Sequence, residues 1–183
     1  MNLLRTLLVT GGARSGKSGF AQSLAEQSSL RKVLIATAEA GDHEMAARIE
    51  RHRRDRQTDW RVVEEPRDLC DKLMVEAGPD RVTVVDCLTL WLANLMFAGR
   101  NVEAEVAALS RCISQISELG HPLILVTNEV GSGIVPADAL TRAFRDHQGR
   151  LNQSLAKVCA QVVLVVAGCP LQIKPQGAAS VRF

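Results

Sequence analysis

Aromatic side chains are scarce in this 183-residue chain: they make up 3% of the sequence, and tyrosine is absent. Proteins that bind single-stranded nucleic acid usually stack the bases on aromatic side chains, so this composition disfavours such a partner. The formal net charge is +2, which gives little support to a general polyanion-binding role. We therefore expect no nucleic acid among the partners of the protein.

The sequence also lacks paired cysteines and long apolar runs. Its five cysteines are widely spaced, odd in number and without a CxxC pair, a pattern that fits neither a disulfide framework nor a zinc site. No apolar stretch reaches the ~20 residues that span a bilayer. The apolar start of the chain leads into a glycine-rich loop, so we interpret it as a strand and not a signal peptide. We expect a cytoplasmic protein with free thiols and no membrane span.

Short apolar segments alternate with helix-like segments along the chain. The predicted strands are Leu3–Thr10, Lys32–Ala36, Trp60–Glu64, Arg81–Asp86, Leu123–Thr127, Gln161–Ala167 and a short edge strand at Leu171–Lys174. The predicted helices are Lys17–Gln27, Asp42–Arg56, Leu69–Ala77, Thr89–Phe97, Val102–Leu119 and one or two helices within Ala137–Ala160. This alternation predicts an α/β fold of three layers with a mostly parallel central sheet. We expect one domain over residues 1–183, with a loosely ordered tail at 175–183.

A phosphate-binding pattern follows the first predicted strand. Residues 11–18 read GGARSGKS, which satisfies G-x-x-x-x-G-K-[ST] between a strand and a helix. The backbone N–H groups of such a loop and the positive end of the following helix attract phosphate. Pattern and context together disfavour the alternative of a chance glycine-rich turn. The predicted phosphate-binding residues are Gly11, Gly12, Ala13, Arg14, Ser15, Gly16, Lys17 and Ser18.

Three further side chains suggest chemistry near this loop. Lys17 would place a charge on the β- and γ-phosphates, and the Ser18 hydroxyl would bind Mg²⁺. Asp86 ends a buried strand; it holds Mg²⁺, caps the next helix, or does both. Glu129 follows the LILVT strand and is either a general base, a residue that orients Mg²⁺, or the acceptor of a loop-closing hydrogen bond.

A segment rich in arginine surrounds one histidine. Residues 44–56 read EMAARIERHRRDR, and helical spacing places His52 between Arg48 and Arg56 on one face. Arginines hold polyphosphate, and a histidine there can attack the α-phosphate of a nucleotide and carry a covalent nucleotidyl group. Spacing alone, however, favours a solvated charged face with ion pairs.

Several segments together resemble one enzyme family: GGARSGKS, LIATAEAGDHEMAARIERHRRDR, WRVVEEP, VVDCLTLWLANLM and LVTNEVGSGIVPADALTRAFRDHQGRLNQSLA. The chain is similar, from about Leu7 to Lys174, to the bifunctional adenosylcobinamide kinase / adenosylcobinamide-phosphate guanylyltransferases of cobalamin biosynthesis. The resemblance implies a RecA-like fold of the P-loop NTPase type. It implies phosphorylation of the aminopropanol hydroxyl of adenosylcobinamide by ATP or GTP. It further implies transfer of GMP from GTP through a guanylyl-histidine, which yields adenosylcobinamide-GDP and pyrophosphate.

The resemblance also assigns roles to residues. It makes His52 the guanylylated histidine, against the interpretation from spacing alone. From the phosphate-loop pattern, we predict that Lys17 is catalytic and that Ser18 and Asp86 bind the metal. Further nucleotide-binding residues that the resemblance implies are Ile35, Ala36, Thr37, Arg53, Arg54, Asp55, Arg56, Glu64 and Asp86. The implied cofactors are GTP, ATP and Mg²⁺, the implied substrates are corrinoids, and the implied assembly is a homo-oligomer, a trimer. Two alternatives remain: a small-molecule P-loop kinase without a covalent step, and a nucleotide-binding switch or ATPase module that serves a protein partner.

Overall fold

A computed structural model of the chain describes residues 5–39 and 59–175. The predicted helix Asp42–Arg56 and residues 176–183 of the predicted tail lie outside these described residues. None of the described helices is long and apolar enough to cross a membrane.

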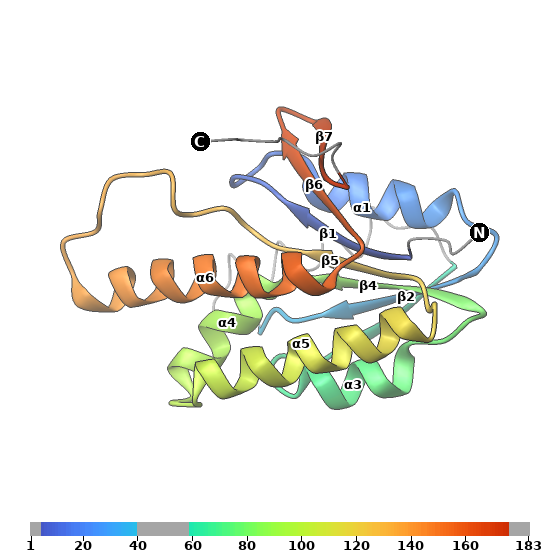
Figure 1. The fold of residues 1–183 in the computed structure, drawn as a ribbon, viewed down its shortest axis with the longest axis horizontal. Coiled ribbons are helices and arrows are strands. Elements are labelled where there is room, and N and C mark those ends of the chain that lie inside the picture. Colours follow the sequence, from blue (N-terminus) through green and yellow to red (C-terminus); the bar gives the residue numbers. More distant parts are fainter. Residues whose placement is uncertain (1–4, 40–58, 176–183) are drawn as a thin grey trace, which may run out of the picture.

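Seven strands form one sheet in the order β3-β2-β4-β5-β1-β6-β7 (Figure 1). The strands are β1 Thr6–Thr10, β2 Arg31–Ala36, β3 Trp60–Glu64, β4 Arg81–Asp86, β5 Leu123–Val126, β6 Gln161–Val166 and β7 Cys169–Lys174. Every neighbouring pair is parallel except β6 and β7, which are antiparallel. The edge strand β7 begins two residues earlier than predicted. It follows a two-residue turn at Ala167 and Gly168, both with positive φ, which matches the twist of a hairpin.

Five helices connect the described strands. They are α1 Lys17–Glu26, α3 Leu69–Glu76, α4 Leu88–Phe97, α5 Val102–Glu118 and α6 Ala139–Val158. The region with one or two predicted helices is therefore a single helix, α6. Its first turn is capped by the Asp138 carboxylate, which accepts a hydrogen bond from the Thr141 backbone N–H at 2.7 Å. Asn101 caps α5 in the same way. Both residues are of the types that satisfy free N–H groups at a helix start.

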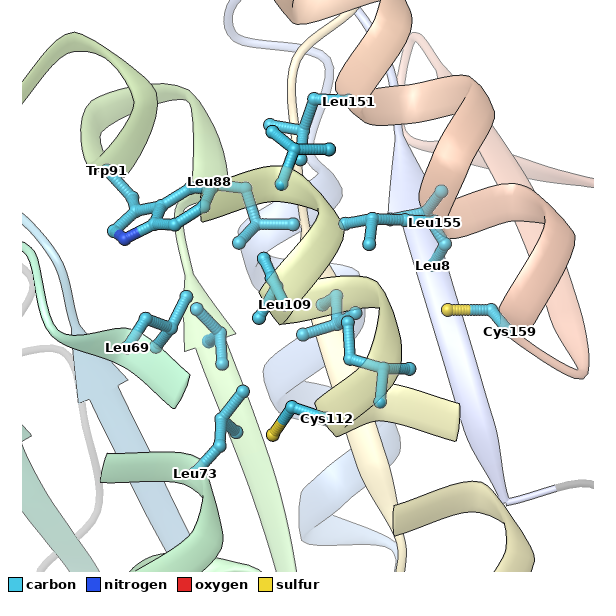
Figure 2. Close-up of a cluster of buried hydrophobic side chains, with 14 of the residues drawn as sticks. Leu8, Leu69, Leu73, Leu88, Trp91, Leu109, Cys112, Leu151, Leu155 and Cys159 are labelled. Carbon is cyan, nitrogen blue, oxygen red and sulfur yellow. The ribbon is translucent and has the colours of Figure 1, made fainter. Parts of the chain in front are cut away.

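The helices cover the two faces of the sheet unequally. Figure 1 shows α1 on one side, and α3, α4, α5 and α6 on the other. Residues alternate along each strand: Leu8 and Val85 belong to the larger core under the four helices, whereas Val9 and Val84 pack with α1. In the larger core, shown in Figure 2, the indole of Trp91 is fully buried, and its N–H donates to the Arg67 carbonyl at 2.8 Å. The core thus leaves that polar group satisfied.

The parallel strands bring separate loops to one edge of the sheet. The segments that follow β1, β2, β3, β4 and β5 all leave at the carboxyl ends of these strands, where α/β folds bind ligands. The strand that leads into the phosphate loop, β1, is separated by β5 from β4, which ends in Asp86. The predicted three-layer α/β fold with a mostly parallel central sheet is confirmed, and the phosphate loop lies between β1 and α1.

Candidate nucleotide-binding site

The predicted phosphate loop forms the turn between β1 and α1. Its backbone is left-handed at Arg14 (φ 55°) and at Gly16 (φ 94°), which is the N-cap of α1. The Lys17 side chain is 7% exposed, and its Nζ donates to the Gly12 carbonyl at 2.9 Å. The loop therefore folds back over the lysine, and α1 directs its positive N-terminal end at the same place.

The phosphate loop packs tightly on the β6–β7 hairpin. A Cβ atom on Gly11 would lie 2.4 Å from the Val165 carbonyl oxygen, and one on Gly16 would lie 3.2 Å from the Gly168 Cα. The Gly168 N–H donates to the Ser15 carbonyl at 2.8 Å. Glycine is required at Gly11 because the neighbouring backbone leaves no room for a side chain.

Ser18 and Asp86 lie close together, although Ser18 follows β1 and Asp86 ends β4. The Ser18 hydroxyl, in the first turn of α1, donates to Asp86 Oδ1 at 3.3 Å. The N-cap of α4 is Cys87, so the Asp86 carboxylate is not used as the cap of that helix. A hydroxyl beside a carboxylate offers the hard oxygen ligands that Mg²⁺ prefers, and the pair therefore fits this ion. Among the described residues no group of three histidine, cysteine or acidic side chains could hold a metal, so phosphates and water would have to complete the coordination.

Residues at the end of β2 fix the backbone next to the Ser18–Asp86 pair. Ile35 lies in the core, and the buried Thr37 hydroxyl donates to the Cys87 carbonyl at 2.6 Å and accepts from the Cys87 N–H at 2.9 Å. The pKa of the Cys87 thiol is raised to about 11, mainly by burial and secondly by the charge of Asp86. The side chains of Ile35 and Thr37 thus make structural contacts, and Thr37 fixes the backbone directly after Asp86.

The strand register aligns three predicted site residues. Ala36 pairs with Glu64 on one side and with Asp86 on the other, so the three residues are neighbours across β3, β2 and β4. Glu64 is exposed at this edge. The other predicted nucleotide-binding residues, His52, Arg53, Arg54, Asp55 and Arg56, lie outside the described part of the chain.

Glu129 closes its own loop. Its Oε1 accepts a hydrogen bond from the Gly131 N–H at 2.7 Å, as one of the sequence interpretations expected. Its backbone N–H donates to the Gly11 carbonyl at 2.9 Å. The segment after β5 is therefore joined directly to the phosphate loop.

A buried polar network, which sequence reasoning missed, holds the segment after β5. Gln148 Nε2 donates to Thr127 Oγ1 at 2.9 Å, and Thr127 Oγ1 donates to Asn152 Oδ1 at 2.8 Å. Asn152 Nδ2 donates to the Asn128 carbonyl at 2.9 Å, and the Asn128 N–H donates to Thr89 Oγ1 at 2.9 Å. The available signal was the spacing of two amides, four residues apart, within FRDHQGRLNQ. The network ties the β5 end to α4 and α6.

Two hydroxyls beside the phosphate loop are buried without a hydrogen-bond partner in the described part of the chain. They are Thr10 Oγ1, at the end of β1, and Ser15 Oγ, inside the loop. Buried polar groups are normally paired, so such atoms mark places where a ligand or water completes the structure. Ser15 was among the predicted residues, whereas Thr10 was not.

Comparisons with known proteins agree over nearly the whole chain. Residues 7–173 match the family described as cobinamide kinase / cobinamide phosphate guanyltransferase. The chain is 46% identical over 169 residues to the bifunctional adenosylcobalamin biosynthesis protein CobP of Pseudomonas aeruginosa, with 91% of this chain and 96% of that protein covered. It is 40% identical over 187 aligned positions to the bifunctional adenosylcobalamin biosynthesis protein CobU of Escherichia coli, with 92% and 99% covered.

A solved structure from Pyrococcus horikoshii OT3 shares the fold alone, with a TM-score of 0.54, 12% identity, and 94% of this chain and 87% of that chain covered. The sequence matches, in contrast, confirm the family predicted from the segments quoted above. The chain belongs to the family of cobinamide kinases / cobinamide phosphate guanyltransferases and is a bifunctional kinase and guanylyltransferase of cobalamin biosynthesis.

Proposed function

We propose that the phosphate loop, Gly11–Ser18, holds ATP or GTP for the kinase step. In this step the aminopropanol hydroxyl of adenosylcobinamide attacks the γ-phosphorus, and the bond to the β-phosphate oxygen breaks. The observation that carries the proposal is the Ser18–Asp86 pair at 3.3 Å beside the buried Lys17. Phosphoryl transfer depends mainly on positioning and on cations near the developing charge, and Lys17 supplies such a charge.

Ser18 and Asp86 are the residues that would hold Mg²⁺, with the other ligands from phosphates and water. The ion, when bound, neutralises charge on the β- and γ-phosphates. Thr37 keeps Asp86 in place through its two hydrogen bonds to Cys87.

The second step uses His52, and this assignment rests on the family resemblance because His52 lies outside the described residues. An imidazole nitrogen attacks the α-phosphorus of GTP, pyrophosphate leaves, and a guanylyl-histidine forms. A phosphate oxygen of adenosylcobinamide-phosphate then attacks the same phosphorus and frees the histidine. Such a covalent step divides one difficult displacement into two. Arg53, Arg54 and Arg56 would hold the GTP phosphates.

Labelling with GTP that carries radioactive phosphorus at the α-position tests the second step. The wild-type protein should acquire an acid-labile label, and His52→Ala should acquire none while it still phosphorylates cobinamide. His147→Ala, which changes a histidine on α6, is the matched control and should keep the label. A wild-type protein that phosphorylates cobinamide without ever being labelled would leave the chain a kinase without a covalent histidine, and label that persists in His52→Ala would place the covalent group on another residue.

The assembly belongs to the same proposal: a homo-oligomer, and more specifically a trimer. Three large aliphatic side chains of the β6–β7 hairpin are exposed at the edge of the sheet, namely Val166, Leu171 and Ile173. An open edge strand with apolar side chains is a surface that proteins usually cover. Light scattering should give three times the mass of the chain for the wild type and a smaller particle for Leu171→Lys. A wild-type particle with the mass of one chain would contradict the assignment.

A further inference from the structure

The connection between β5 and α6 carries an apolar tip that is open to solvent. We call residues 130–140 the apolar loop. Ile134 is 97% exposed, Val135 is 61% exposed, and Leu140, in the first turn of α6, is 58% exposed. Figure 1 shows the connection running out from the body of the protein before it enters α6. Exposed groups of large aliphatic side chains mark surfaces that bind something, because water contact forgoes the gain of burial.

The exposure of the tip is not the result of loosely held ends. At the β5 end, the Asn128 N–H donates to Thr89 Oγ1, and the Asn128 carbonyl accepts from Asn152 Nδ2. At the α6 end, Arg142 Nη1 donates to the carbonyls of Pro136 at 3.0 Å and Ala137 at 2.5 Å. The side chains are therefore presented to solvent from a stem that is fixed on both sides.

The stem of the apolar loop also touches the phosphate loop. The Glu129 N–H donates to the Gly11 carbonyl at 2.9 Å, one residue before the apolar loop begins. A molecule bound on the apolar loop consequently lies at the same edge of the sheet as the phosphates of a nucleotide on Gly11–Ser18. This is the side from which a phosphate acceptor must approach.

We propose that the apolar loop binds the corrin ring of the cobinamide substrate and presents its aminopropanol arm to the phosphate loop. This proposal rests on the proposed kinase function of that loop. The corrin ring is a broad macrocycle with apolar faces and neutral amides at its rim, and ligand sites of this kind are mainly apolar. Residues 130–137, VGSGIVPA, include no charged side chain.

The alternative occupant is a second copy of this chain, and the size of the patch disfavours it. A standard protein interface buries about 800 Å² on each partner, over 20 or more residues. The apolar loop offers three aliphatic side chains and no strand edge with which a second copy could pair, unlike the β6–β7 hairpin, whereas three such side chains suit one face of a macrocycle. The exposed apolar side chains of the β6–β7 hairpin form a separate surface, on another part of the chain.

The test compares Ile134→Ser with Val75→Ser, a matched control because Val75 is 72% exposed on α3, away from the apolar loop. Equilibrium dialysis with cobinamide gives its Kd without catalysis, and the kinase assay gives KM for cobinamide and for the nucleotide. In Ile134→Ser, Kd and KM for cobinamide should rise about tenfold, with the nucleotide KM unchanged. Ile134→Leu should bind like the wild type, and so should Val75→Ser.

Two results would overturn the proposal: a cobinamide Kd for Ile134→Ser within about twofold of the wild type, or a fall in particle mass in that variant, which would assign the patch to a second copy. Failure of the kinase proposal has a different signature. In that case the wild-type protein binds cobinamide and the Ile134→Ser protein does not, but the Lys17→Met protein still phosphorylates cobinamide.

Discussion

Replacement of Thr37 by valine tests the inference that this residue fixes the backbone behind Asp86. Valine has nearly the shape of threonine but lacks the hydroxyl, which donates to the Cys87 carbonyl at 2.6 Å and accepts from the Cys87 N–H at 2.9 Å. Thr37 is fully buried, so both Cys87 groups would be left without this partner. The Cys87 N–H would be left unsatisfied, which costs about 1–3 kcal/mol, whereas the Cys87 carbonyl keeps the Trp91 N–H at 3.2 Å and loses one hydrogen bond of about 1 kcal/mol; the free energy of unfolding should therefore fall by roughly 2–4 kcal/mol.

The control is Thr37→Ser, which keeps the hydroxyl and removes one buried methyl group, at a cost of about 1 kcal/mol. Urea unfolding gives the difference directly, and for a chain of this size Tm should fall by at least about 4 °C in Thr37→Val. The cobinamide kinase kcat should fall further in Thr37→Val than in Thr37→Ser, because Asp86 precedes the loosened peptide. A Thr37→Val protein as stable as Thr37→Ser would refute the reasoning.

Three further predictions concern other parts of the chain. Gly11→Ala should weaken nucleotide binding at least about tenfold in calorimetric titration, because its Cβ would lie 2.4 Å from the Val165 carbonyl; Gly19→Ala, in α1 with nothing within 4 Å, should bind normally. The Arg61 guanidinium, bonded to the buried Glu76, lowers the pKa of that carboxyl. The Arg61–Glu76 pair thus stabilises the fold at pH values above the usual carboxyl pKa. This stabilisation is lost as the pH falls through the lowered pKa of Glu76. Between about pH 6 and about pH 3, urea unfolding of Glu76→Gln should therefore show less acid destabilisation than the wild type. Native thiol titration at about pH 8 should modify Cys169, which is exposed, well before Cys87 or Cys159, whose pKa values burial raises to about 11 and about 12. An unchanged nucleotide Kd in Gly11→Ala would contradict the first inference, and parallel pH profiles of unfolding for Glu76→Gln and the wild type would contradict the second. Equal rates of modification for the three thiols would contradict the third.

Local signals were sufficient to predict the secondary structure of the described chain. Each predicted strand is present, as a strand of four to six residues, because the length of the apolar runs and their flanking turn residues point to buried strands. The start of β7 was misplaced by two residues because the turn at Ala167 and Gly168 places a non-glycine residue at positive φ. Sequence alone gives little warning of that conformation.

The arrangement of the site depends on tertiary contacts that local pattern does not encode. The meeting of Ser18 with Asp86 requires the strand order, with β5 between β1 and β4, and this order is set by packing across the whole sheet. The assignment of Thr37 to the nucleotide stays a prediction, and local pattern did not indicate that its hydroxyl donates to the Cys87 carbonyl. Gln148 is polar within an amphipathic helix, which normally indicates an exposed position, yet it is fully buried in the network behind β5.

The central claim is that Gly11–Ser18 is the kinase site. The rate at which the Lys17→Met protein transfers the γ-phosphate to cobinamide tests this claim most directly. Methionine fills nearly the same buried space as lysine and removes the charge together with the hydrogen bond to the Gly12 carbonyl, so the fold should persist in urea unfolding. Loss of one group that stabilises transition-state charge lowers kcat by about 10²–10³-fold, and we predict a fall of at least that size. A folded Lys17→Met protein that phosphorylates cobinamide within about threefold of the wild-type rate would contradict the account.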